Sequence, residues 1–421
     1  MNRWWPDLSR FRWAPFAVLA FVALWPTVGP AELVLSLGAI SGIAILAWSR
    51  FRDGTSLISR EAWALSTALF FCYWLPELFS AFDAVDRAHA WAEVLVDLRY
   101  LPFLWLVAMA VAQGRGRRRV FAGIGVIVLL WSLDASVQAV SGVSLGGPNT
   151  SDRLSGVFGA GNLKLGLVLA SLSPFAFDLL GRRGGDLGWL LLAFVLGLVI
   201  LLAGSRASWL SYGIVLAVCG WQRFGRRRLL IYLGAGLVVA SALALSFSTQ
   251  FESRLERTGE VLNGDVDGLD QALSGRISIW RAATGMFLDH PVNGVGVRGF
   301  RELYPRYAPP DDPWLSQGQG GALHAHQLLL EVLCETGAIG LLLWLMGAAL
   351  AIRAWRWALP ASRERAAAPA LALAVTLFPL NTHLAFYSTF WGGVTLLLAA
   401  MYAGALFAID DEVAAPVPAD A

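Results

Sequence analysis

The sequence is poor in charged residues. Aspartate, glutamate, lysine and arginine make up 15% of the 421 residues, whereas hydrophobic residues make up 57% and the mean hydropathy is +0.60. A soluble domain of ordinary composition would have about a quarter of its residues charged. The apolar residues come in long runs, such as LVLSLGAISGIAILAW and VFAGIGVIVLLWSLDASVQAV, that match the roughly 20 residues needed to cross a bilayer. This composition excludes a soluble protein and predicts an all-α protein with several membrane spans.

Cysteine and lysine are also scarce. Cys72, Cys219 and Cys334 lie in apolar runs far apart, which predicts small buried hydrophobic residues and no disulfide or metal framework. Lys164 is the only lysine. The many arginines suit bidentate phosphate or carboxylate contacts, although GC-rich codon usage would produce the same bias. A net charge of +2, without a basic stripe that includes aromatic residues, excludes a nucleic-acid partner.

Hydropathy predicts about twelve membrane spans. The first apolar run lacks a cleavage site of the A-x-A type, so we expect a retained span and not a removed signal peptide. The expected spans are residues 14–29, 33–48, 62–80, 92–112, 119–141, 161–180, 187–204, 207–222, 229–247, 326–352, 367–383 and 386–408.

Arginines are dense in every second connection between these spans. The dense set includes RGRRR from Arg115, RFGRRR from Arg223 and RAWRWALPASRER from Arg353, whereas the alternate short connections have only Arg87, Arg153 and Arg206. By the positive-inside rule the dense set is cytoplasmic, and so are both termini.

Residues 248–325 form one long polar connection on the exterior side. Within it, Ile277, Trp280, Thr284 and Phe287 have a helical spacing, and glycine and proline dominate afterwards. We expect two or three short helices over the membrane and an ordered loop. The predicted organisation is nine spans in 1–247, a loop domain in 248–325, three spans in 326–408 and a disordered tail in 409–421.

Four arginines on the exterior side are candidates for ligand binding. Arg206 lies in a tight turn between two spans, Arg276 and Arg281 lie in the loop helix, and Arg153 lies in a glycine-rich connection. Singly, each would suit a snorkelling arginine at the interface. Together they would form a cationic pocket for an anionic headgroup such as pyrophosphate.

Two histidines precede the tenth span. The pair His324 and His326 has the i, i+2 spacing of a weak zinc motif, but no exterior cysteine accompanies it, and we expect no metal. His326 is a candidate general base, since imidazole titrates near neutral pH. The alternative is an interface histidine bonded to a backbone carbonyl. Glu331 and Glu335 share a helix face, with Glu331 about 7–8 Å below His326, and we expect them to support the site structurally.

Four segments lie in order between Asp152 and Leu345. They are DRLSGVFGAGNLKLG, LLAGSRASWL, SGRISIWRAATGMFLDHPVNGVGVRGF and HAHQLLLEVLCETGAIGLLLWL. Together they resemble the O-antigen ligase and O-antigen polymerase family of bacterial membrane glycosyltransferases. Gln327 stands where the family usually has asparagine, and AGN, ending at Asn162, replaces the more common N-P-N.

The resemblance implies en bloc transfer of a glycan from undecaprenyl pyrophosphate at the periplasmic side of the bacterial inner membrane, with no metal, cofactor or nucleotide sugar. It implies that Arg206 and Arg276 bind the pyrophosphate and that His326 is the catalytic histidine. The transfer would invert the anomeric carbon. We expect the substrate-binding surface to be completed by Arg153, Arg281, His324 and Gln327.

Several functions fit this pattern. A ligase would use lipid A–core as acceptor, a polymerase would extend the lipid-linked chain, and a third branch glycosylates proteins. The single large exterior connection favours the ligase. A secondary transporter would place ionisable residues near the middle of the bilayer on repeated, broken helices, whereas here they lie at one membrane face and no repeat is evident.

Overall fold

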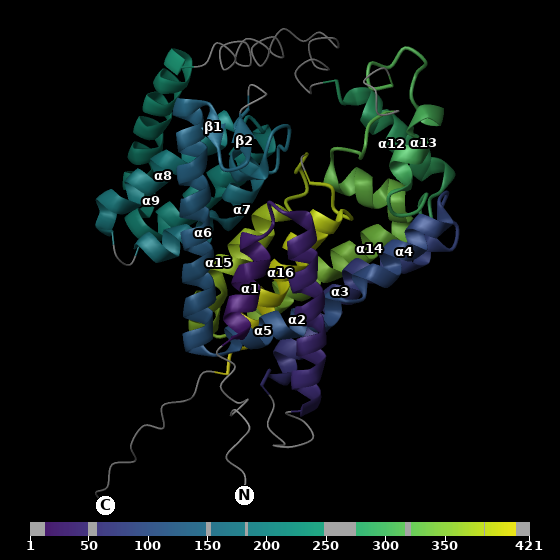
Figure 1. Cartoon of the computed structure of the whole chain (residues 1–421), viewed down its shortest axis with the longest axis horizontal. Helices are drawn as coiled ribbons and strands as arrows, with labels where there is room; N and C mark the ends of the chain where they lie inside the picture. Colours follow the sequence, from purple (N-terminus) through teal and green to yellow (C-terminus); the bar gives the residue numbers. More distant parts are fainter. Residues whose placement is uncertain are drawn as a thin grey trace, which may run out of the picture.

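The computed structural model describes residues 13–48, 57–148, 153–181, 184–247, 275–315, 321–382 and 384–409. The expected tail from residue 410 and the first part of the expected loop domain, 248–274, lie outside the described residues. The described chain is a bundle of helices, and its only strands are two short ones that form a hairpin (Figure 1). The all-helical class predicted from hydropathy is therefore confirmed.

The described part of the chain up to Ser141 forms six helices. Its elements are α1 (Ala14–Ala23), α2 (Val28–Trp48), α3 (Arg60–Ala81), α4 (Arg87–Asp97), α5 (Tyr100–Ala112) and α6 (Gly114–Ser141). Ser59 caps α3 by accepting from the backbone N–H of Ala62 at 3.1 Å, and Asp86 caps α4 through the N–H of His89 at 3.0 Å. α4 and α5 together form one apolar unit that covers Arg87–Ala112.

A hairpin and three helices follow α6. They are β1 (Val143–Ser144) paired antiparallel with β2 (Gly147–Pro148), the 3₁₀ turn η3 (Gly156–Phe158), α7 (Leu165–Gly181), α8 (Gly185–Leu202) and α9 (Arg206–Phe247). α9 is interrupted at Gly225, where φ is 72°. Because the chain turns there, Leu229 packs onto Gly220, and a Cβ on that glycine would lie 2.5 Å from its Cδ1.

The last helices form the exterior layer and the centre of the bundle. They are α12 (Ile277–Asp289), α13 (Gly299–Tyr307), α14 (Leu328–Trp357), α15 (Pro360–Thr376) and α16 (Thr389–Leu406). α16 is the most buried of the long apolar helices, at 89%. It packs closely on α5, where a Cβ on Gly404 would lie 2.5 Å from the carbonyl oxygen of Ala108.

Two buried tyrosines stabilise this centre by donating their hydroxyl protons to backbone carbonyls. Tyr100 donates to Thr389 at 3.0 Å, and Tyr402 donates to Ala351 at 2.8 Å. These bonds tie α16 to its neighbours where water would be excluded.

The number of long spans differs from the sequence prediction. Among the described residues, seven helices are long and apolar enough to cross a membrane, not twelve. α1 and α7 are apolar but have only 10 and 17 residues, which is short for about 30 Å of hydrocarbon. The two spans expected at 207–222 and 229–247 both fall in the broken helix α9. The protein is thus a polytopic membrane protein, and the count of twelve stays a prediction.

The elements of the expected exterior side lie at one end of the bundle. α12 and α13 lie at the same end as the β1–β2 hairpin, at the top of Figure 1. The described part of the loop region contains two short helices, α12 and α13, and this agrees with the two or three expected.

Candidate functional site

The loop after α12 is attached to α14 by a break in that helix. At Gly337 the backbone has φ 63° and ψ −160°, so the regular hydrogen bonds of α14 are interrupted. The carbonyls of Cys334 and Glu335 accept instead from the backbone N–H groups of Val295 and Gly296, at 2.9 and 3.0 Å. Residues 294–296 (GVG) and 335–337 (ETG) therefore lie next to each other, although they belong to two different segments of those that resemble the O-antigen ligase family.

Glycine is required at this junction on both sides. A Cβ on Gly337 would lie 2.3 Å from the carbonyl oxygen of Val292, and a Cβ on Gly294 would lie 2.3 Å from the carbonyl carbon of Glu335. Both glycines also have positive φ, 63° and 70°. The atoms that such a Cβ would contact belong to the backbone, which cannot move aside as a flexible side chain could. Neither position therefore has room for a side chain.

Gly337→Ala is expected to lower the free energy of unfolding by about 2–5 kcal/mol, because it adds a steric overlap to an unfavourable backbone conformation. The measurement is thermal unfolding of the detergent-solubilised protein. Gly213→Ala is the control, since nothing lies within 4 Å of its Cβ position in α9. Equal stability of the two variants would contradict this account of the junction.

The histidine loop ends where α14 begins. His326 has φ 49°, in the left-handed region, and its ring centroid lies 3.8 Å from that of His324. The backbone N–H of His326 donates to His324 Nδ1 at 3.3 Å. The two rings therefore lie next to each other in the loop before α14.

Gln327 uses its amide to build the helix. Its Oε1 accepts from the backbone N–H of Leu330 at 2.5 Å as the cap of α14, and its Nε2 donates to the carbonyl of Pro379 at 3.1 Å. Both polar ends of the side chain therefore have protein partners. The position expected to bind substrate is in this structure a capping residue that holds the histidine loop.

Trp314 joins the histidine loop to the start of α12, and sequence reasoning did not single it out. Its ring centroid lies 6.3 Å from that of His326, and its indole N–H donates to the carbonyl of Gly275 at 2.7 Å. Asp312 Oδ1 accepts from the backbone N–H of Trp314 at 2.8 Å, and its Oδ2 accepts from the Tyr304 hydroxyl at 2.8 Å. An Asx turn in the stretch DDPW was the available sequence signal.

Three of the predicted arginines converge on this site from distant parts of the chain. Arg276 immediately precedes α12, Arg206 begins α9, and Arg153 precedes η3. The pKa of Arg276 is lowered by burial and by the positive charges of Arg206 and Arg153. The Arg153 segment is held at the end of α8, next to the start of α9, by a bond from the N–H of Leu154 to the carbonyl of Leu202 at 3.3 Å.

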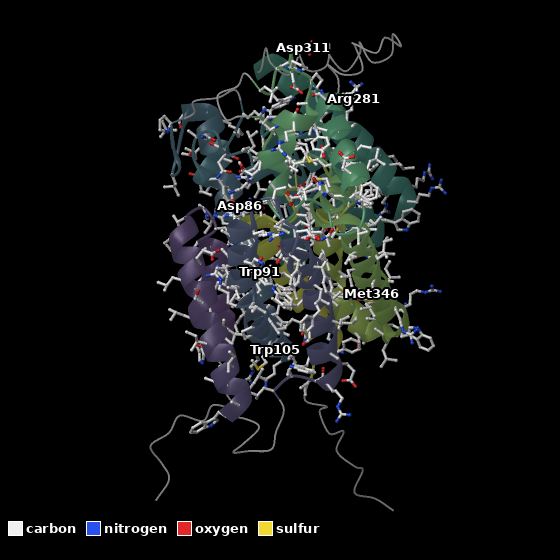
Figure 2. The ribbon with its side chains drawn as sticks, turned by 90° about the vertical axis from the view of Figure 1, so that its right-hand side faces the viewer. Asp86, Trp91, Trp105, Arg281, Asp311 and Met346 are labelled. Atoms are coloured by element: carbon white, nitrogen blue, oxygen red, sulfur yellow. The ribbon has the colours of Figure 1, made fainter. Side chains whose placement is uncertain are left out.

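Arg281, the fourth predicted arginine, lies apart from this group. Its side chain is exposed on α12, near the upper end of the molecule in Figure 2, and its charge is not among those that lower the pKa of Arg276. The five residues that separate it from Arg276 carry it more than one turn around the helix.

Arg298 and Arg301 are additional cations that sequence reasoning missed. Both lie close enough to His324 for their charges to lower its pKa. Arg298 has φ 65° at the start of α13, and its Nε lies 3.4 Å from Oε1 of Glu93. They follow the glycine-rich segment VNGVG, where the pattern indicated only a turn.

The two glutamates lie beneath the histidine loop in α14. Both are buried, at 2% and 3% exposure for Glu331 and Glu335. Oε2 of Glu331 lies 3.6 Å from His324 Nδ1, and its carboxylate faces the backbone N–H groups of Phe386 and Tyr387. Glu331 thus connects the histidine loop to the segment before α16.

His324 is neutral at physiological pH. Burial, and then the charges of Arg276, Arg301 and Arg298, lower the pKa of His324 from its ordinary value of 6.5 to about 4. His324 therefore adds no further positive charge to the arginine group near pH 7.

This low pKa predicts an acid-sensitive fold. As pH falls below 6.5, the unfolded chain binds a proton at residue 324 before the folded chain does, so stability is lost progressively until about pH 4. We expect a loss of about 3 kcal/mol across this window, measured as a fall in the thermal midpoint, and a smaller fall in His324→Gln. Parallel curves for the two proteins would contradict the assignment.

The described residues contain no group of three or more His, Cys, Asp or Glu side chains arranged to hold a metal ion. The cations of the site are instead guanidinium groups, with fixed donors for phosphate oxygens.

The fold and this cluster define an integral membrane protein whose charged site lies at one end of an apolar bundle. Residues 191–345 match the family model described as O-antigen ligase, so this part of the chain is an O-antigen ligase domain. The resemblance found in the sequence is thereby confirmed. The matched segment includes Arg206, Arg276 and the histidine loop, whereas Arg153 lies before it.

No curated protein matches the chain. The matched family is one of membrane glycan transferases of the O-antigen ligase and polymerase type, which act on lipid-linked glycans, and residues 191–345 are similar to it.

Proposed function

We propose that the protein is an O-antigen ligase that transfers a glycan en bloc from undecaprenyl pyrophosphate to a sugar hydroxyl of lipid A–core. The observation that carries this proposal is the convergence of Arg153, Arg206 and Arg276 beside the histidine loop. Guanidinium groups that converge at one place present the fork-shaped donors and the positive charge that bind pyrophosphate oxygens.

In this reaction Arg276 and Arg206 bind the pyrophosphate oxygens. The bond between the anomeric carbon and the phosphate oxygen breaks, and the electron pair leaves with the pyrophosphate. Fixed guanidinium groups stabilise the negative charge that develops on the leaving group, because they need no reorganisation during the reaction. Arg153 adds to the positive potential around the same group.

His326 accepts the proton of the acceptor hydroxyl as the new glycosidic bond forms. Attack occurs opposite the pyrophosphate, so the configuration at the anomeric carbon is inverted. Imidazole suits this role because it takes up a proton near neutral pH. Trp314 and His324 flank the His326 ring and would restrict its orientation.

The proposed orientation places this site in the periplasm. The arginine-rich segment RGRRR lies at the start of α6, and RAWRWALPASRER connects the end of α14 to the start of α15. These helix ends lie at the end of the bundle opposite the candidate site, and the positive-inside rule assigns them to the cytoplasm. A lipid-linked donor and a lipid A–core acceptor would then meet at the outer surface of the inner membrane, with both termini cytoplasmic.

The test is a transfer assay with the purified protein and lipid-linked glycan, with lipid A–core in one reaction and additional donor alone in the other. Growth of the lipid A–core product supports the ligase. Lengthening of the lipid-linked chain without any lipid A–core product would show a polymerase and refute the proposed acceptor. A protein acceptor mixed with the donor tests the third branch of the family.

We expect EDTA to leave the transfer rate unchanged, because guanidinium groups supply the positive charge for the leaving group. The measurement is the initial rate with and without an excess of chelator. Loss of activity that a divalent cation restores would contradict this prediction. The Arg276→Ala variant serves as the comparison in which the charge itself is removed.

A further inference from the structure

A large cavity lies at the end of the bundle opposite the candidate site. Its volume is about 1460 Å³, and it lies among the first turns of α6 and α15, the last turn of α7, the middle of α9 and the end of α14. Trp355 of α14 lines it. Because 27 residues separate Trp355 from Leu328 at the start of α14, the cavity is about 40 Å from the histidine loop along the helix. It is therefore not part of the candidate site.

The cavity is lined by more cations than anions. Its acids are Asp178 and Glu364, and its cations are five arginines, so positive side chains outnumber negative ones in its lining. The five are Arg117, Arg118, Arg223, Arg363 and Arg365. Because positive side chains are in excess, we expect the cavity to prefer an anionic ligand.

Two of these arginines hold the protein together. Arg223 bonds to the carboxylate of Asp186 at 2.9 Å and to the carbonyl of Gly181 at 2.9 Å. Arg363 donates to the carbonyls of Ala358 and Arg356 at 3.0 and 2.6 Å. These bonds fix the ends of α7, α8 and α14 around the opening, so the cavity has ordered walls.

The other arginines lie on two helices that face the cavity. Arg118 is exposed on the first turn of α6, and Arg365 is half-buried on α15. Arg365 donates to the hydroxyl of Ser362 at 2.8 Å through one guanidinium nitrogen. A planar guanidinium presents N–H donors in a fork that matches the oxygens of a phosphate.

The rest of the lining is apolar and aromatic. Phe121, Phe177, Trp189 and Leu371 belong to it, so a ligand that fills the cavity must present hydrocarbon as well as charge. Trp221 and Trp357 are 59% and 80% exposed on the neighbouring helices α9 and α14. Exposed tryptophans beside arginines are typical of the boundary between hydrocarbon and headgroups.

We propose that this cavity binds an anionic phospholipid, with its phosphate against Arg118 and Arg365 and an acyl chain along the aromatic wall. Basic pockets between membrane helices bind the headgroups of acidic lipids in this way. The volume exceeds the usual range for small-molecule sites, roughly 300–1,000 Å³, as an occupant with a headgroup and chain requires. A free phosphate would contact the arginines but leave the apolar wall uncovered.

The test is native mass spectrometry of the full detergent-solubilised chain, titrated with phosphatidylglycerol. Arg118→Gln combined with Arg365→Gln should bind it roughly 30-fold more weakly, about fivefold for each arginine. The matched control is Arg227→Gln combined with Arg228→Gln. These two arginines are exposed on α9 near the same turn but do not line the cavity, and their removal changes the net charge equally.

We expect the control to bind phosphatidylglycerol as the parent does. Equal weakening in both double variants would overturn the proposal, since binding would then depend on overall charge. Phosphatidylcholine that binds as tightly as phosphatidylglycerol would also overturn it, because the arginines would have no role. Inorganic phosphate that displaces the lipid completely at millimolar concentration would show a site for a free anion and would likewise refute the lipid assignment.

Folding is checked separately in the same variants. The thermal midpoint without lipid should change little, since neither substitution touches Arg223 or Arg363. Arg118→Lys combined with Arg365→Lys retains the charge and should regain part of the affinity. If these lysines restored no binding in a folded protein while the control bound normally, the charge attraction proposed here would be refuted.

Discussion

His326→Asn is expected to lower the rate of glycan transfer by about 10²–10⁴-fold, because an amide cannot take the proton of the acceptor hydroxyl. Binding of the lipid-linked donor should change little, since the pyrophosphate contacts of the proposal belong to arginines. The two measurements are the initial transfer rate and the affinity for the donor in the absence of acceptor. A selective loss of rate would assign the imidazole to the chemical step.

The backbone determines which substitution is informative at this position. His326 has φ 49°, a conformation that asparagine adopts more readily than other non-glycine residues. Alanine would add about 1–2 kcal/mol of backbone strain in the histidine loop and confuse a loss of chemistry with a loss of structure. Asparagine removes the base and keeps the turn.

His290→Asn is the matched control, because His290 also belongs to the exterior layer and ends α12. It should retain the parent rate. Full activity in His326→Asn would remove the base assignment, and a parallel loss of donor affinity would indicate that His326 instead holds the substrate.

Arg276→Ala should reduce kcat/KM for the donor by about 10²-fold or more, because one fixed donor to the leaving group is lost. Arg276→Lys should restore only part of the loss. Lysine returns the charge but not the two parallel N–H groups that match a pair of phosphate oxygens. The same pattern, with alanine worse than lysine and lysine worse than arginine, is expected at Arg206.

Arg281→Ala tests whether the effect of Arg276→Ala on kcat/KM depends on the position of the arginine or only on the loss of one positive charge. It removes the same charge from the same helix, five residues away, where the side chain is exposed and apart from the convergent group. We expect a change of less than about threefold, within the ±0.5 kcal/mol usual at surface positions. An effect as large as that of Arg276→Ala would contradict the convergence that carries the proposed function. Full rescue of Arg276 by lysine would show that a point charge suffices.

From the sequence we predicted that rare exterior arginines would lie together, but the sequence did not identify every residue of the cluster. Arg153, Arg206 and Arg276 were predicted to lie together because they are rare on a side where cations are sparse, and the structure brings them together. Arg281 was grouped with them because distance along a sequence does not specify the direction of a side chain around a helix.

Some members of the site had no distinct pattern in the sequence. Arg298 follows a run of glycines, and only the contact between that loop and the broken helix α14 brings it to His324. Trp314 reaches His326 because its indole bonds to Gly275, a partner 39 residues away. Gln327 has the donor and acceptor expected of a substrate ligand, but the start of α14 and Pro379 use both.

Composition and periodicity determined the class of this protein. Apolar runs need a bilayer, arginines at alternate connections indicate its two sides, and four ordered segments predict the O-antigen ligase domain. Tertiary structure alone decided which charges meet, which glycines allow the loop to contact α14, and that a basic cavity lies at the opposite end of the bundle. The reason is physical. Hydrophobic patterning acts locally along the chain, whereas a site depends on the packing of segments that are distant in sequence.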